Sequence, residues 1–410
     1  MRTTTEGAWP ELRSRSLAVG SLMIRLLAGP LVIAFAAPAI AAPDLLAQNP
    51  LLQDLPAPDN EVYRTMGGPE LYRAACAACH GVDGTGAEPS TLAFVEIMPD
   101  FTGCSFATRE PDADWIAVAH DGGPTRGFSP MMPAFGGMLR PEDLQRVMDY
   151  VRTLCDDPAW PRGELNFPRA MFTEKAYPED ELVWTVDTSV EDGPRSVMHE
   201  VIYEKRFGPR SQVEVAVPFG IRERPGGGAA ARDGWVGGLG DVALGLKHAL
   251  YHSGSARSIL AVAGEVKLPT GRTRAGFGGE TTVFETFVSV GQALPSDGFF
   301  QAQAVAEFPT ASAFANELVL RGVLGKTFTE GSWGRAWTPM LEVQAKREME
   351  SGEDWGWNLA PQFQVTLNTR QHVMANVALL LPLTDREVRE TRLYVYLLWD
   401  WFDGSFLDGW

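Results

Sequence analysis

The chain has 410 residues, of which 45% are hydrophobic and 21% are charged, and this composition excludes a protein that is disordered throughout. Its net charge of −17 argues against nucleic acid as a partner, because phosphate groups attract the opposite charge. Four cysteines are too few for a fold built on disulfides, and the length allows two or three domains.

Residues 1–41 have the order of a secretory signal peptide. Scattered arginines precede the apolar stretch 26–35, and small residues follow it. A membrane anchor helix is the alternative, but two prolines interrupt a run that is too short to span a bilayer. We therefore expect an exported chain that is cleaved near Ala41 and continues with a flexible segment, residues 42–59.

A C-x-x-C-H motif, formed by Cys76, Cys79 and His80, predicts the chemistry of the next domain, residues 60–160. Two thiols one helical turn apart can add to the two vinyl groups on one porphyrin edge, and the adjacent histidine then reaches the iron. A redox or zinc-binding cysteine pair is the alternative. The export signal, the helical flanks and a downstream methionine loop favour one covalently bound haem c.

Two helices are expected to enclose this motif. Residues 69–78 predict the first helix, and residues 141–154 predict the last one, which starts at a proline. Packing the two helices together would bring Tyr72 near Tyr150. The apolar stripe of the last helix consists of Leu144, Val147, Val151 and Leu154.

With this motif and these helices, the segment resembles a monohaem class I cytochrome c, an all-α fold. In that family a Met-Pro pair before the last helix supplies the sixth iron ligand, and here Met132 directly precedes a proline. The resemblance therefore implies His80 and Met132 as axial ligands, with Met131 and His120 as weaker alternatives. It also implies that the carbonyl of Pro89 accepts the Nδ1 proton of His80.

The other two cysteines, Cys104 and Cys155, lie in the same exported domain. A disulfide between them would close a loop of roughly fifty residues and stabilise the fold by ~3–4 kcal/mol. Two buried free thiols are the alternative.

The haem domain is acidic and contains no lysine between Ala42 and Pro168. Most of this charge belongs to solvated surface. An acidic face around a haem edge would select a basic redox partner and speed their encounter.

After a proline-bearing linker, residues 161–171, the sequence alternates between apolar and polar residues with the period of β-strands. Residues 172–410 predict an antiparallel barrel of twelve strands. The expected strands are residues 181–187, 197–207, 211–223, 238–251, 258–269, 281–294, 299–308, 317–328, 337–348, 357–367, 372–383 and 391–402.

A soluble sandwich shares this pattern, but three observations favour an outer-membrane barrel. The strands are long, their non-apolar face is charged, and short joins alternate with long ones, although the join at 329–336 breaks the alternation. An even strand number leaves both termini in the periplasm. Tryptophans near the strand ends fit interfacial girdles, and these are Trp235, Trp337, Trp355, Trp357, Trp399 and Trp401.

Two stretches, residues 238–247 and 264–271, resemble the outer-membrane family of the MetA-pathway of phenol degradation. The resemblance implies a transporter-like barrel in contact with outer-membrane lipids, without indicating a substrate. The aromatic end of the barrel would be Phe402 or Trp410.

These features favour an electron carrier without enzymatic activity: a periplasmic cytochrome attached to an outer-membrane barrel. The alternative is a porin or small-molecule transporter with a haem sensor or gate. A haem peroxidase is disfavoured, because a methionine ligand would occupy the open iron position and no distal His-Arg pair is evident.

Overall fold

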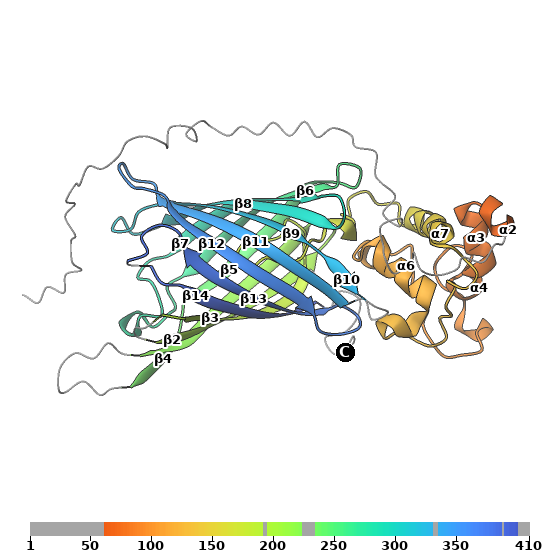
Figure 1. The fold of residues 1–410 in the computed structure, drawn as a ribbon, viewed down its shortest axis with the longest axis horizontal. Helices are drawn as coiled ribbons and strands as arrows, with labels where there is room; N and C mark the ends of the chain where they lie inside the picture. Colours follow the sequence, from red (N-terminus) through yellow and green to blue (C-terminus); the bar gives the residue numbers. More distant parts are fainter. Residues whose placement is uncertain (1–60, 192–194, 224–233, 331–334, 388, 401–410) are drawn as a thin grey trace, which may run out of the picture. The chain divides into compact units, whose positions relative to one another are not determined.

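The computed structural model describes residues 61–191, 195–223, 234–330, 335–387 and 389–400. The expected signal peptide, the segment 42–59 and the aromatic residues Trp401, Phe402 and Trp410 lie outside these residues. A helical region comes first along the chain and a β-region follows it (Figure 1).

The helical region begins at Glu61 and its last long helix ends at Leu154. None of the described helices is long and apolar enough to cross a membrane. The elements are α2 (Glu61–Thr65), α3 (Gly68–Ala75), α4 (Ala77–His80), η2 (Pro89–Thr91), α5 (Cys104–Ala107), α6 (Asp112–Asp121), η3 (Gly123–Arg126) and α7 (Pro141–Leu154).

The core of this region forms where α3 packs against α7. Tyr72 lies edge-on to Tyr150, with 5.2 Å between the ring centroids, as the sequence predicts. Gly68 permits the close approach, because a Cβ at this position would lie 2.1 Å from the carbonyl oxygen of Arg146. The buried apolar side chains include Leu71, Ile116, Leu139, Leu144, Val147, Met148 and Val151.

A disulfide joins Cys104, at the start of α5, to Cys155, directly after α7. Their Cα atoms are 5.2 Å apart. The bond links α5 to the end of α7, and its two cysteines are 51 residues apart in the sequence.

The β-region contains fourteen strands in a single sheet (Figure 1). They are β1 (Asp180–Ser189), β2 (Ser196–Phe207), β3 (Ser211–Glu223), β4 (Trp235–Leu239), β5 (Val242–Ser253), β6 (Ser258–Leu268), β7 (Val283–Ala293), β8 (Gly298–Pro309), β9 (Glu317–Lys326), β10 (Phe328–Glu330), β11 (Arg335–Glu348), β12 (Gly356–Thr366), β13 (Val373–Pro382) and β14 (Arg392–Asp400). Two short helical turns, η4 (Gly163–Leu165) and η5 (Thr273–Ala275), lie outside the sheet.

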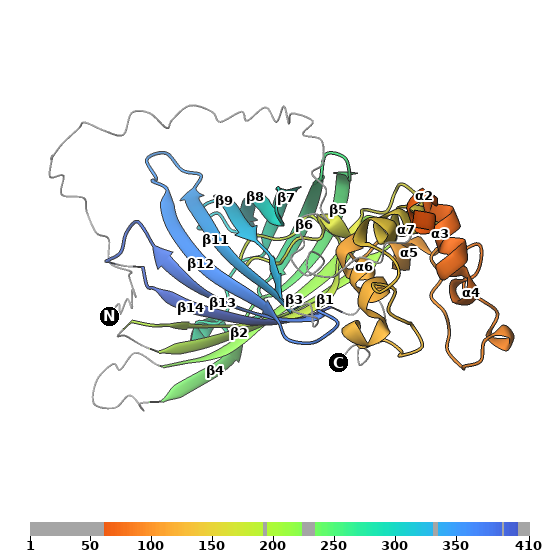
Figure 2. The same ribbon diagram turned by 45° about the vertical axis from the view of Figure 1, so that its right-hand side comes forward.

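These strands form a closed antiparallel barrel of twelve wall positions, which confirms the predicted number. β1 pairs with β14, and β9 pairs with β11, so the sheet has no open side. β4 and β5 both pair with β3 and share one wall position; β9 and β10 both pair with β11 and share another. Figure 2 shows the strands running around a common interior.

The barrel is apolar outside and polar inside, as in proteins that cross the outer membrane. On β5, Leu244 and Leu246 are about half exposed, whereas Lys247, which directly follows Leu246, is 4% exposed. On β11, Leu341 is exposed and Glu342 is fully buried. The alternation predicted from the sequence is therefore present with the expected faces.

Short joins lie at one end of the barrel and long joins at the other. The join that was expected to break this rule follows it, because β10 extends the hairpin and leaves only residues 331–334 between β10 and β11. β1 begins and β14 ends at the short-turn end, where Glu181 pairs with Asp400.

Residues 161–179 are called the connector below. Residues 161–171 were expected as a linker and residues 172–179 as the start of the barrel domain, but Leu165–Tyr177 pack against inward-facing residues of the barrel. The connector contacts inward-facing side chains of many strands at the short-turn end. Gln362 accepts a hydrogen bond from the backbone N–H of Met171, and Gln301 donates one to the carbonyl of Pro168, both at 2.9 Å. Its buried apolar residues Leu165, Phe167, Ala170, Ala176 and Tyr177 pack on Phe299, Val323 and Met340 of the wall.

Candidate functional site

The C-x-x-C-H motif lies at the junction of α3 and α4. Cys76 ends the first helix and begins the second, and its carbonyl accepts hydrogen bonds from the N–H groups of Cys79 and His80 at 3.2 and 2.9 Å. Both cysteines are free thiols and partly buried. The motif is therefore a single helical turn that carries two thiols and one imidazole.

The loop after this turn folds back onto it. The backbone N–H of Gly86 donates to the carbonyl of His80, and that of Ala87 donates to the carbonyl of Cys79, both at 2.9 Å. Gly81 and Gly86 have positive φ angles of 74° and 89°, which glycine adopts without steric cost. These contacts fix the position of the motif.

The imidazole of His80 is held by burial and by an aromatic neighbour. Its ring stacks on Phe101, with 4.8 Å between centroids. Burial lowers the pKa of His80, which favours the neutral form that binds metals. Nδ1 of His80 is buried and has no hydrogen-bond partner within the described ranges.

The donor set fits a c-type haem. Cys76 and Cys79 remain free, whereas Cys104 and Cys155 are joined to each other. Burial, followed by the neighbouring Cys79, raises the pKa of the Cys76 thiol to about 11. The turn thus presents two free thiols and one imidazole, which are the groups that the haem attachment motif requires.

The structure does not contain the hydrogen bond expected between His80 and Pro89. Pro89 begins the 3₁₀ turn η2, and its carbonyl accepts the N–H of Leu92 at 3.2 Å. A carbonyl oxygen can accept two hydrogen bonds, so this turn does not exclude a bond from His80, and the assignment of Pro89 stays a prediction.

The two candidate methionine ligands lie between η3 and α7, and the alternative His120 lies near the end of α6. Met132 is partly buried and its carbonyl accepts the N–H of Gly123 at 3.0 Å, whereas Met131 is 46% exposed. Nδ1 of His120 lies 2.6 Å from Asp121 Oδ1, and the His120 ring packs against Gly136, where a Cβ would lie 2.5 Å away. Burial favours Met132 over Met131, and His120 already has a partner.

The sequence reading missed the aromatic residues that support the motif. Phe101 contacts both His80 and Trp115, and the Arg152 guanidinium lies 4.6 Å from the centre of the Trp115 ring. Nothing in the spacing of these residues signals this arrangement, since they come from a loop, α6 and α7. Only the fold brings them together.

Comparison with known proteins identifies the helical region. Residues 64–151 match the family described as cytochrome c oxidase, cbb3-type, subunit III. The Cbb3-type cytochrome c oxidase subunit FixP of Sinorhizobium medicae is 27% identical over 157 residues, which are 38% of this chain and 52% of that protein. The chain thus spans about half the length of this curated relative.

Solved structures resemble the β-region in fold. An outer membrane channel from Pseudomonas putida F1 is 13% identical and covers 57% of this chain and 99% of its own, with a TM-score of 0.39. The KdgM porin is 8% identical and covers 54% of this chain and 99% of its own, with a TM-score of 0.37.

Proposed function

Because residues 64–151 form a cbb3-type cytochrome c domain and β1 to β14 form an outer-membrane-type barrel, we propose that the chain is an electron carrier of the outer membrane. One haem c is bound covalently by Cys76 and Cys79, with His80 and Met132 as axial ligands. The observation that carries this proposal is the free thiol pair beside a buried, neutral imidazole on one helical turn.

When bound, a haem supplies an iron centre that accepts and releases a single electron. The protein contributes position and surroundings. The α4 turn places both thiols on the same side as His80, and Phe101 orients the imidazole by stacking on it. The backbone of Met132 is held in place by hydrogen bonds with Gly123 and Ser129.

The topology supports a periplasmic cytochrome domain. Both ends of the barrel wall lie at the short-turn end, and in bacterial barrels the short turns face the periplasm. The domain precedes β1 and so belongs on that side, after export and removal of residues 1–41. The apolar outer face of the barrel contacts lipid.

The redox partner is proposed to be a basic protein. The segment from Ala42 to Pro168 lacks lysine and is acidic, so it attracts positive charge at a distance. The relative is named as an oxidase subunit. We propose that this chain passes electrons to a partner and is not itself an oxidase, since a Met132 ligand would fill the open iron position.

A gated channel is the second candidate function, and the polar lumen favours it. Inward-facing residues such as Glu342, Gln362 and Gln364 are buried from bulk solvent and hydrophilic. The connector fills the short-turn end of this lumen. A channel would therefore open only when the connector moves.

A fractionation experiment tests the main proposal. Full-length protein is expected in the outer-membrane fraction, where its denatured band stains for haem and its reduced spectrum is that of a c-type cytochrome. Cys76→Ser with Cys79→Ser should abolish the stain and keep a heat-modifiable barrel. The matched pair Cys104→Ser with Cys155→Ser should keep the stain. A colourless wild-type protein would contradict the proposal.

A further inference from the structure

The turn between β12 and β13, residues 367–372, contacts the segment of the cytochrome domain that leads to Met132. The Arg370 guanidinium lies 4.6 Å from the centre of the Phe128 ring, and Nη2 of Arg370 donates a hydrogen bond to the carbonyl of Gly127 at 3.4 Å. Gly127 has a φ angle of 69°, and a Cβ there would lie 3.8 Å from Arg370 Nε. A turn of the barrel therefore packs on two consecutive residues of the cytochrome domain.

Backbone hydrogen bonds connect this contact to Met132. The N–H of Phe128 donates to the carbonyl of Gly123 at 2.9 Å, and the N–H of Gly123 donates to the carbonyl of Met132 at 3.0 Å. The N–H of Met132 in turn donates to the carbonyl of Ser129 at 3.2 Å. A displacement of Phe128 is therefore passed on to the residue that is proposed as the sixth ligand.

The segment around Met132 is weakly buried. Its exposed residues are Gly127, Phe128, Pro130, Met131 and Pro133. A loop of this kind gains little packing energy from its own domain, so a contact from outside the domain has a large share in fixing its position. Arg370 supplies such a contact from the barrel.

Further contacts hold the barrel against the cytochrome domain near this turn. Nε2 of His372, at the end of the turn, lies 3.5 Å from Glu110 Oε1. Asp180, the first residue of β1, is 1% exposed and forms an ion pair with Arg109. Arg109 and Glu110 precede α6, whereas Gly127 follows it, so the barrel contacts the chain on both sides of this helix.

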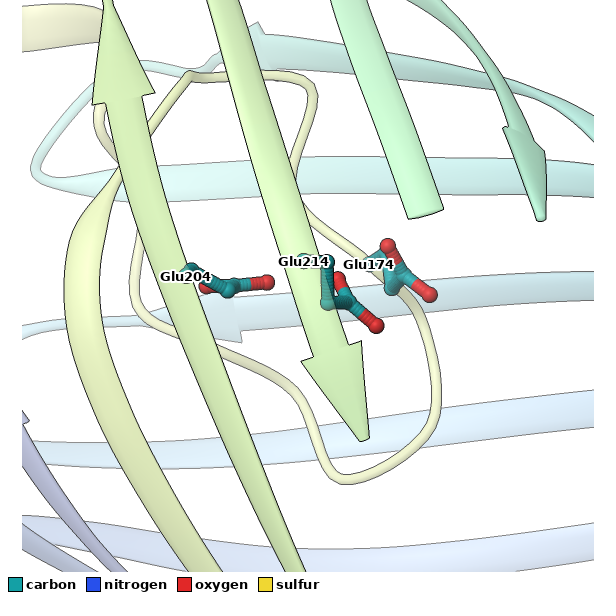
Figure 3. Close-up of side chains that lie close together, drawn as sticks. All are labelled: Glu174, Glu204 and Glu214. Carbon is teal, nitrogen blue, oxygen red and sulfur yellow. The ribbon is translucent and has the colours of Figure 1, made fainter. Parts of the chain in front are cut away.

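The connector joins the same two parts of the chain through the lumen. Figure 3 shows Glu174 of the connector beside Glu204 of β2 and Glu214 of β3, and carboxylate oxygens of the three lie within 4.8 Å of one another. Arg169 of the connector pairs with Glu204 at 3.0 Å. Because the connector is held by the wall, the cytochrome domain that precedes it stays next to the turn that carries Arg370.

We propose that Arg370 is a positioning residue for the haem: from the barrel, it holds the Met132 loop in place and so keeps the thioether available as a ligand. This inference rests on the proposed function, because it takes Met132 as the sixth ligand. A guanidinium above an aromatic ring at a partly exposed site shifts an equilibrium by about two- to fivefold. An added base that competes with Met132 therefore binds more easily when Arg370 is removed.

Imidazole titration of the oxidised full-length holoprotein in detergent, followed by visible spectra, tests this proposal. Arg370→Ala should strengthen imidazole binding by about two- to fivefold, and Arg370→Lys, which keeps a cation near the ring, should restore most of the wild-type affinity. Arg257→Ala is the matched control. Arg257 lies in the turn between β5 and β6 at the same end of the barrel and donates to the carbonyl of Leu294 at 3.3 Å, so its removal should leave imidazole binding unchanged.

A double-mutant cycle separates positioning from a general loss of structure. Phe128→Leu removes the ring, so Arg370→Ala should change imidazole binding less in this background than in the wild type. Haem staining and heat modification check that each variant is folded. If Arg370→Ala is not folded, Phe128→Leu takes its place and should itself strengthen imidazole binding.

The outcomes distinguish this inference from the proposed function. Equal imidazole affinity of the wild type and Arg370→Ala, or full additivity of the two substitutions, overturns the inference while the proposed electron carrier stands. A wild-type spectrum without the absorption band of a methionine–iron bond contradicts Met132 as ligand, and the inference then fails together with that part of the proposed function.

Discussion

The hydroxyl of Tyr72 donates a hydrogen bond to the carbonyl of Gly81 at 2.8 Å, and the carbonyl of His80 lies 3.2 Å away. This hydrogen bond ties α3 to the residue that follows the C-x-x-C-H turn. Helix α3 also leads directly into the start of that turn. Tyr72 is completely buried, so this bond is shielded from water.

Tyr72→Phe should lower the free energy of unfolding of the cytochrome domain by ~1–2 kcal/mol, because two carbonyls lose a buried donor. Denaturation of the holoprotein followed by haem absorbance measures this. Tyr150→Phe keeps the edge-on ring contact and serves as control. Equal stability of the wild type and Tyr72→Phe would show that the bond is unimportant.

Met132→Ala should leave the haem attached but lower the reduction potential and let added imidazole bind the iron, because a thioether ligand stabilises the reduced state. Potentiometric titration and visible spectra of both redox states measure these changes. Met131→Ala is the matched control, since this neighbouring side chain is half exposed. If Met131→Ala produces the change instead, the ligand assignment is wrong.

Asp143 predicts a pH dependence of stability. Its burial opposes ionisation, but hydrogen bonds from Arg140 and the charges of Arg140 and Arg146 outweigh this and hold the pKa of Asp143 below its usual range. A lowered carboxyl pKa in the folded state stabilises the protein above the unfolded-state pKa, and this contribution is lost as the pH falls through the lower folded-state value.

Asp143→Asn should therefore destabilise the cytochrome domain by ~1.5–3 kcal/mol at pH 7, with the difference from the wild type shrinking below about pH 4. Urea denaturation at a series of pH values measures it. Glu142→Gln, an exposed neighbour in the same helical turn, should have little effect. A difference that stays constant down to pH 2 would refute the electrostatic explanation.

Arg169→Gln should loosen the connector. The change leaves Glu181 and Glu204 buried without their shared cation, at a cost of about 3–5 kcal/mol. We expect a lower temperature of heat modification and a higher conductance in planar bilayers. Arg195→Gln removes an ion pair whose arginine is 72% exposed, so it should change both properties little. Unchanged conductance in Arg169→Gln would mean that the connector does not limit passage.

Local patterns predicted most of the fold. The strand positions follow from the period of two, since inward residues are mostly polar and outward residues are mostly apolar. Helix α7 has the predicted limits because a proline and two acidic residues start it, and an apolar stripe packs it on α3. The C-x-x-C-H motif also predicted which two thiols and which imidazole lie together on one helical turn.

Long-range contacts were beyond sequence reasoning. The connector has no periodicity, and its partners, such as Gln301, Glu342 and Gln362, come from separate strands. That Glu204 of β2 lies opposite Glu214 of β3 depends on strand register, which single strands do not reveal.

The disulfide between Cys104 and Cys155 has a consequence for how the protein matures. Four cysteines permit three complete pairings, and only pairing outside the C-x-x-C-H turn is compatible with thioether formation by Cys76 and Cys79. Under the proposed haem attachment, an oxidant that acts on Cys76 or Cys79 would therefore consume thiols that the haem needs. A cell that oxidises the chain too early would accumulate mispaired, haem-free molecules.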